Sequence, residues 1–172
     1  KSKKYGALTN FTYHTGQYLP DWHPWEDIKD FYVSNRETGG AREIVPFELT
    51  WITEVFGFPV ESKGMFAKTF NLGVDIDDTY GIVMNFPNGI GTLTVDVVSM
   101  FATRSLIVNL EKAQIRWNWE DGFMKIFERD KNRWVIFNQP ESRLSVGYNQ
   151  NIIEDMYIEE INTFINSCLN NE

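Results

Sequence analysis

The two histidines of the chain, His14 and His23, flank one short aromatic segment that also carries carboxylates. Imidazole titrates near neutral pH, so two such groups close together can hold a ligand or transfer protons. The segment runs from Gly16 to Glu26 and contains two prolines, which restrict its backbone. A purely structural alternative stays open, in which His14 closes a strand and His23 caps a short helix by hydrogen bonding.

Aromatic and charged side chains are interleaved in and just after this segment, a combination typical of carbohydrate sites. Rings stack on the apolar faces of a sugar, while carboxylates and arginines bind its hydroxyl groups. We therefore expect the following residues to bind a substrate: Tyr18, Asp21, Trp22, Trp25, Glu26, Arg36 and Arg42. A solvated surface with scattered rings is the alternative, although exposed aromatic clusters promote aggregation.

A third candidate for proton transfer is Glu48, which stands between two apolar residues in a segment with helical periodicity. A carboxylate in that setting is expected to be partly buried, as catalytic carboxylates often are. The candidate catalytic residues are therefore Glu48, His23 and His14. An ion pair between Glu48 and a nearby arginine explains the same pattern equally well.

Hydrophobic periodicity predicts the elements that position these residues. A first strand is expected over 6–14, a short helix over roughly 25–31, and a helix from about Ile44 to a stop at Gly57, kinked or broken by Pro46. Further strands are expected at 60–70, 78–86, 90–99, 104–110, 113–119, 123–128 and 132–137, and a closing helix at 150–170.

Turn residues connect these strands into a meander. Asn88-Gly89 predicts a tight hairpin, because Asn and Gly accept the positive φ of a two-residue turn. Glu120–Gly122 and Arg129–Asn132 predict the next two turns, and Asp75–Asp78 a strand-entry turn that lacks the Gly and Glu of a calcium loop. The predicted fold class is α+β, a large, mostly antiparallel, open-faced sheet with helices packed on one face.

Composition narrows the function further. The 172 residues carry 16 Lys and Arg against 24 Asp and Glu, a net charge of −8, so nucleic acid is not an expected partner. Cys168 is the single cysteine, which excludes an intrachain disulfide and fits a reducing compartment; we expect a cytoplasmic protein. No transmembrane stretch and no metal-binding motif is present in the sequence, so neither a membrane nor a metal site is expected.

Three segments resemble the C-terminal domain of the glucose-fructose oxidoreductase and inositol dehydrogenase superfamily, Gfo/Idh/MocA. They are Gly39-Gly40-Ala41 with the helix that ends in Val55–Val60, the run from Asp77 to Leu93, and the closing helix Tyr157–Leu169. The resemblance implies that residues 1–172 form one substrate-binding and dimerisation domain, dihydrodipicolinate-reductase-like in fold. It further implies that NAD or NADP binds mainly to an N-terminal Rossmann domain absent from this chain, and the start at Lys1 without Met suggests a piece of a longer protein.

The family usually has a histidine, with an aspartate three residues on, in the helix after the glycines. Those places are taken here by Glu48 and Trp51. Three alternatives follow: Glu48 takes over as proton acceptor, or His14 or His23 reaches the pocket from the loop, or the chemistry differs. The resemblance thus implies an NAD(P)-dependent oxidoreductase acting on a sugar or sugar derivative, and the domain alone is expected not to turn over.

Two other functions stay open. A non-catalytic carbohydrate-binding or scaffold module would use the same aromatic loop, and a glycosidase would use Asp21 and Glu26 as its carboxylate pair. We also expect a homodimer through the 80–137 sheet, because helices cover one face while the other keeps large side chains such as Trp117, Trp119 or Trp134.

Overall fold

The computed structural model describes residues 4–138 and 154–170, which belong to two compact units, Lys1–Asn138 and Gln139–Glu172. The second unit contains the helix α2 (Glu154–Asn170), within the segment where the closing helix is predicted. The first unit contains α1 (Ala41–Phe56) and eight strands: β1 (Leu8–Tyr18), β2 (Glu61–Ala67), β3 (Thr79–Phe86), β4 (Gly89–Asp96), β5 (Val98–Leu110), β6 (Ala113–Asn118), β7 (Phe123–Glu128) and β8 (Arg133–Asn138). Neither described helix is long and apolar enough to cross a bilayer.

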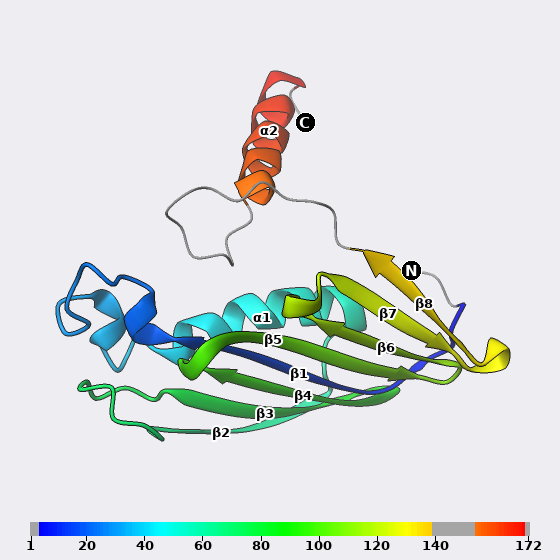
Figure 1. Cartoon of the computed structure of the whole chain (residues 1–172), viewed down its shortest axis with the longest axis horizontal. Helices are drawn as coiled ribbons and strands as arrows, with labels where there is room; N and C mark the ends of the chain where they lie inside the picture. Colours follow the sequence, from blue (N-terminus) through cyan, green and yellow to red (C-terminus); the bar gives the residue numbers. More distant parts are fainter. Residues whose placement is uncertain (1–3, 139–153, 171–172) are drawn as a thin grey trace. The chain divides into compact units, whose positions relative to one another are not determined.

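The eight strands form one sheet in the order β2-β3-β4-β1-β5-β6-β7-β8 (Figure 1). β1 lies in the middle, pairing parallel with β4 and antiparallel with β5. The other neighbouring pairs are antiparallel, most of them hairpins in sequence order. The predicted fold class, a mostly antiparallel open-faced sheet, is therefore confirmed.

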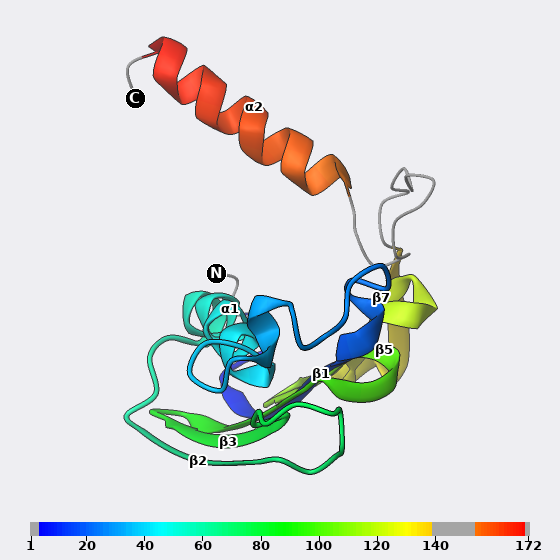
Figure 2. The same cartoon turned by 90° about the vertical axis from the view of Figure 1, so that its left-hand side faces the viewer.

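The helix α1 covers one face of the sheet, and within residues 4–138 no α-helix covers the other (Figure 2). Phe11 stacks on Phe56 of α1 with ring centroids 4.5 Å apart, and Tyr13 meets Trp51 edge-on at 5.0 Å. Successive side chains of a strand point to opposite faces. The odd-numbered residues of β1 from Phe11 to Thr15 therefore face α1, and the even-numbered ones face the open side.

Two glycines fix the start of α1. A Cβ on Gly39 would lie 2.1 Å from the carbonyl oxygen of Val33, and Gly40 has a φ of 68°. Pro46 does not break the helix, one of the two expected outcomes, since α1 is continuous from Ala41 to Phe56. A proline six residues into the helix removes only one backbone hydrogen bond there, and Pro46 is exposed to solvent, which can satisfy the carbonyl it leaves unpaired.

The strand predictions are confirmed to within a few residues, except that β1 continues to Tyr18 and β5 begins at Val98. The helix expected over 25–31 is wrong. Residues 19–38 form turns with two short 3₁₀ helices, Leu19–Asp21 and Tyr32–Ser34. Stacked side chains rather than backbone periodicity organise this loop, as the site geometry below shows.

The hairpin between β3 and β4 forms, but with a different use of its glycine. Phe86 pairs with Gly89, so the turn residues are Pro87 and Asn88, and Gly89 lies in the strand without a positive φ. A Cβ at Gly89 would lie 2.5 Å from the carbonyl oxygen of Thr9, so the glycine allows β1 to approach. The next two turns follow expectation and end in left-handed residues, Gly122 and Asn132.

The acidic run before β3 is a strand-entry turn, as predicted. Asp78 is fully buried, and its carboxylate accepts hydrogen bonds from the backbone amides of Thr69 and Phe70 and from the hydroxyls of Thr69 and Thr79. These bonds tie the connection between β2 and β3 to the start of β3.

At one end of the sheet, Glu128 gathers four hydrogen-bond donors. Its carboxylate oxygens lie 3.1 to 3.2 Å from Lys4 Nζ, Tyr5 Oη, Lys131 Nζ and Arg133 Nε. Hydrogen bonds from Lys4 above all, and from its other neighbours, lower the pKa of Glu128 to about 2. The carboxylate thereby binds the segment before β1 to the turn between β7 and β8.

A carboxyl group whose pKa is lower in the folded chain stabilises the fold above its ordinary pKa, here 4.5, and the stabilisation disappears as the pH falls towards 2. We therefore expect the urea concentration at the unfolding midpoint to decrease as the pH is lowered from 4.5 to 2. The decrease should be smaller in the Glu128→Gln variant. Glu120→Gln, an exposed turn carboxylate, is the matched control. Parallel curves for wild type and Glu128→Gln across this range would contradict the role of Glu128.

Candidate active site

The structure places His14 on the open face of the sheet, away from α1. His14 follows Tyr13 in β1, and Tyr13 packs on Trp51 of α1, so strand alternation directs His14 to the other side. Its cross-strand neighbours are Thr94 of β4 and Ser105 of β5. His14 therefore does not share a pocket with residues on the α1 side.

His14 is held there by Asp96, whose Oδ2 lies 2.6 Å from His14 Nε2. Asp96 also accepts hydrogen bonds from the amides of Val98 and Ser99 and from the Ser99 hydroxyl. Burial alone would raise the pKa of Asp96, but the hydrogen bonds from His14, Ser99 and the backbone outweigh burial and lower it. The result is an anchored pair at the centre of the open face.

His23 lies in the loop after β1 within a column of rings. It stacks on Phe31 with centroids 3.9 Å apart and on Trp25 at 5.1 Å, and its Nδ1 lies 2.9 Å from Glu26 Oε2. A cavity of about 110 Å³ adjoins this column, lined by Leu19, Pro20, His23, Glu26, Ile28 and Phe31. That volume is small beside the 300 to 1,000 Å³ common for ligand pockets.

The other loop candidates differ in exposure. Trp25 is 73% exposed and Asp21 is exposed, so both can meet a ligand. Tyr18 and Trp22 are partly buried and pack against the hydrophobic core, and Trp22 Nε1 is buried without a hydrogen-bond partner among the described residues. Tyr18 and Trp22 thus contribute to the loop's packing whether or not they bind a ligand.

The two predicted arginines are both exposed. Arg36 forms ion pairs with Asp75 at 3.2 Å and with Asp77 at 3.5 Å, which tie the loop to the segment before β3. Arg42 lies in the first turn of α1. The loop reaches the same turn through the Tyr32 hydroxyl, which donates to Glu43 Oε1 at 2.8 Å.

Glu48 lies one turn further along α1 and is only 6% exposed. Its Oε2 accepts a hydrogen bond of 2.7 Å from Trp51 Nε1. Burial raises the pKa of the Tyr13 hydroxyl, and the negative charge of Glu48 raises it further, while the positive charge of Arg104 opposes the shift. Tyr13 therefore stays protonated and able to donate a hydrogen bond beside the Glu48 carboxylate.

These positions separate the predicted site residues into three groups. The loop residues and Arg42 lie around the start of α1. Glu48 lies in the middle of α1, on its buried side, and His14 lies on the opposite face of the sheet. His14, His23, Arg42 and Glu48 therefore do not line a single pocket. The individual roles of these residues stay predictions.

Four residues of the Glu48 surroundings are absent from the predicted site: Tyr13, Trp51, Arg104 and Trp119. Arg104 faces α1 in a row with Leu106, Val108 and Leu110 of β5. A charged residue within an apolar row of period two is a signal that the sequence carries. The pairing of β1 with β5, which brings Tyr13 beside this row, is not visible in the local pattern.

Among the described residues, no three His, Cys, Asp or Glu side chains gather closely enough to hold a metal ion. A second cavity, of about 490 Å³, lies on the other flank of α1 and has no charged side chain in its lining.

The Trp51 hydrogen bond to Glu48 can be tested by stability. Trp51→Phe keeps a ring at this position but leaves a buried carboxylate one donor short, so we expect the free energy of unfolding at pH 7 to fall by about 1 to 3 kcal/mol. In the double variant Trp51→Phe with Glu48→Leu, the total loss of unfolding free energy should be smaller than the sum of the losses in the two single variants. Additive losses in urea unfolding would show that the bond contributes little.

A comparison with protein-family models finds no match to the chain, and neither does a comparison with curated proteins. Solved structures do match. UDP-N-acetylglucosamine 3-dehydrogenase from Acidithiobacillus ferrooxidans aligns with 98% of the chain at a TM-score of 0.65 and 12% identity, using 47% of its own length. An oxidoreductase from Agrobacterium radiobacter, solved with NAD⁺, L-tartaric acid and magnesium, aligns with 86% at 0.66 and 12% identity, using 42% of its length.

Levoglucosan dehydrogenase in complex with NADH and levoglucosan aligns with 85% of the chain at a TM-score of 0.64 and 12% identity, using 46% of its length. The chain thus spans about half the length of the structures that it matches. At these identities the matches establish the fold. The resemblance stated from the motifs is confirmed at that level: the chain has the fold of the C-terminal domain of Gfo/Idh/MocA oxidoreductases.

Proposed function

We propose that this chain is the substrate-binding and dimerisation domain of an NAD(P)-dependent oxidoreductase that acts on a sugar or sugar derivative. The observation that carries the proposal is the shared fold: two of the matching proteins are named as dehydrogenases of sugar compounds, and another was solved with NAD⁺. The buried Glu48 carboxylate with its polar neighbours gives the α1 face a group suited to proton transfer.

In the oxidation of an alcohol, the carbon gives up a hydride and the hydroxyl oxygen gives up a proton. Glu48 accepts that proton in our proposal, while Trp51 orients its carboxylate and Tyr13 stays a neutral donor beside it. His23, next to Glu26 in the loop, is the second candidate for the same transfer.

The described residues do not fit a dinucleotide cradle of the Rossmann type. The space beside the paired glycines before α1 is occupied by the chain itself, since Gly39 lies against the Val33 carbonyl and Gly40 against Ile76. The sequence also lacks a Gly-x-Gly-x-x-Gly run. The nicotinamide is therefore assigned to a dinucleotide-binding domain outside these residues.

The test uses the full-length protein that the gene encodes, in which a dinucleotide-binding domain is sought upstream of Lys1, and measures NADH formation with a panel of sugars. Glu48→Gln still accepts the Trp51 hydrogen bond but cannot take a proton, so we expect kcat to fall by about 100-fold or more with the fold intact. His23→Ala tests the second candidate, and Glu120→Gln is the control. Wild-type turnover in both Glu48→Gln and His23→Ala would refute these roles.

One observation favours the alternative of a non-catalytic carbohydrate-binding module. Trp25 is largely exposed and stacks on His23 beside Glu26, an arrangement that can hold a sugar without reacting with it. In that case Trp25→Ala would abolish sugar binding measured by calorimetry, Glu48→Gln would leave it unchanged, and no dinucleotide-binding domain would be found upstream.

Dimerisation is proposed through the open face of the sheet. Ile90 and Ile107 are exposed there, as their neighbours Gly91 and Val108 face Phe11 on the α1 side. Trp134 also lies on the open face, where the cationic groups of Arg116 and Lys125 lie over its ring. Trp117 does not lie there, since it pairs with Leu106 on the α1 side, and Trp119 belongs to the turn after β6.

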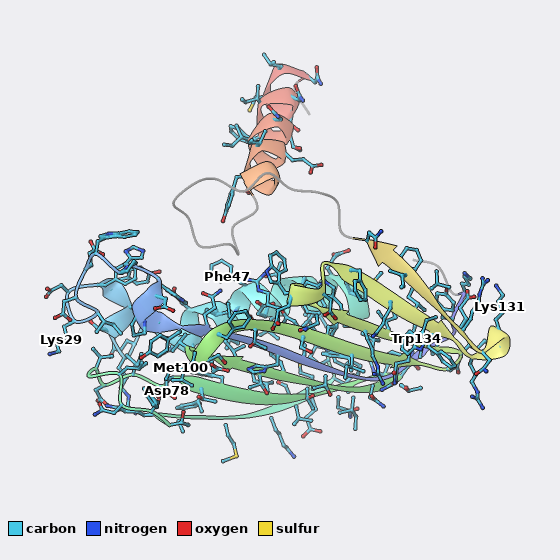
Figure 3. The ribbon with its side chains drawn as sticks, in the orientation of Figure 1. Lys29, Phe47, Asp78, Met100, Lys131 and Trp134 are labelled. Carbon is cyan, nitrogen blue, oxygen red and sulfur yellow. The ribbon has the colours of Figure 1, made fainter. Side chains whose placement is uncertain are left out.

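We expect sedimentation velocity to show a dimer at micromolar concentration. Ile90→Asp, on the open face, should convert the dimer to a monomer, because it would bury a charge in the interface. Phe47→Asp is the control, since Phe47 is 72% exposed on α1 and lies on the other side of the sheet (Figure 3). A wild-type monomer at high concentration, or equal effects of both variants, would count against this interface.

A further inference from the structure

Arg104, a basic side chain on the α1 side of the sheet, differs from Arg36 and Arg133 in its surroundings. Arg104 is partly buried in β5, and its strand partner is Thr15 of β1. Its positive charge acts on the Tyr13 hydroxyl, which in turn feels the charge of Glu48. Arg104 therefore belongs to the surroundings of Glu48, although it comes from a different strand.

No carboxylate among the described residues lies within ion-pair distance of Arg104. Among the described residues its guanidinium carbon lies 5.8 Å from the centroid of the Trp119 ring, a cation–π contact. By contrast, Arg36 is paired with Asp75 and Asp77, and Arg133 with Glu128. The chain has an excess of eight acidic residues, so the missing partner is not explained by a shortage of carboxylates.

Withdrawing a cation from water costs free energy unless an anion or several hydrogen bonds compensate. The cation–π contact with the indole ring of Trp119 compensates in part, and it uses none of the N–H donors of the guanidinium. Those groups match the two oxygens of a carboxylate or a phosphate. The arrangement is that of a side chain prepared for an anionic ligand.

We propose that Arg104, supported by Trp119, recognises an anionic group on the substrate, so that the substrate is a sugar bearing a carboxylate or a phosphate. This inference rests on the proposed function. Glu48 carries its own negative charge on the same face, which repels a second anion, so the neutral hydroxyl end of the substrate belongs beside Glu48 and the anionic end beside Arg104.

Calorimetric titration of the full chain tests the inference with four probes: D-glucose, D-glucuronate, D-glucose 6-phosphate and inorganic phosphate. We expect at least one of the two anionic sugars to bind about 10- to 100-fold more tightly than glucose, with an affinity that falls as salt is added. The carboxylate and phosphate probes identify which anion the site prefers.

Arg104→Gln should remove the preference for the anionic sugar while leaving the weaker binding of glucose in place. Arg104→Lys, which keeps the charge but loses the planar pair of donors, should retain part of it. Arg116→Gln is the matched control, because Arg116 lies on the opposite face of the sheet, paired with Ile107. Circular dichroism and urea unfolding of each variant confirm that the fold is kept.

The outcomes separate this inference from the proposed function. Equal affinity for glucose and both anionic sugars, unchanged by Arg104→Gln, overturns the role of Arg104 and leaves the sugar site standing. Inorganic phosphate that binds as tightly as the sugar phosphate, and is lost in Arg104→Gln, overturns the sugar part. Loss of anionic-sugar preference in Arg116→Gln but not in Arg104→Gln contradicts the assignment directly.

Discussion

The pairing of β1 on both of its edges is the constraint on which the rest of the first unit depends. β1 joins β4 in parallel on one side and β5 antiparallel on the other, so it links the β2–β4 part of the sheet to the β5–β8 meander. Because its side chains alternate, it also determines which polar groups share a face. Tyr13 is placed beneath α1 with Glu48 and Arg104, and His14 is placed with Asp96 on the open side.

The two faces consequently carry polar groups of different character. Beneath α1, a carboxylate, a phenol and an arginine lie among aromatic rings, where low polarity strengthens their interactions. On the open side, Thr12 bonds to Thr92 and Asn10 bonds to Asn109, so polar side chains are linked along the surface. Partly buried charge beneath α1 suits chemistry, whereas the open side combines these linked polar groups with the exposed apolar side chains of Ile90 and Ile107, as an interface with a second copy would.

Most of the sheet can be predicted from the sequence, because the strands from β2 onward alternate and are separated by turn residues such as Gly122 and Asn132. The α1 helix is also predictable from its periodicity. The loop at 19–38 is not, since side-chain stacking of His23 on Phe31 holds it, and such contacts leave no periodic signal. Gly89 is misread for a related reason: its role depends on the carbonyl of Thr9, eighty residues earlier.

The candidate site also depends on contacts between residues that are distant in the sequence, which the local pattern does not predict. Glu48 is predictable because it interrupts an apolar helix locally, but its association with Tyr13 and Arg104 requires the order of strands across the sheet. His14 and His23 are close in sequence and end on different sides of the molecule's sheet, since the chain turns at the end of β1. Proximity along the chain is therefore a poor guide: the alternation of β1 determines the face of His14, but not the position of His23, which lies in the loop after the strand.

The central place of β1 also bears on how the chain acquires its structure in time. Tyr13 pairs with Leu93 and with Leu106, so the strand made early during synthesis waits for partners about eighty and ninety residues later. Contacts this distant in sequence slow folding, because the loops that they close carry a high entropic cost. The hairpins from β5 to β8 are local, so we expect them to form before β1 is inserted between β4 and β5. Until that step its apolar side, with Phe11 and Tyr13, is exposed to other chains, which makes the interval before insertion the period of greatest risk for aggregation.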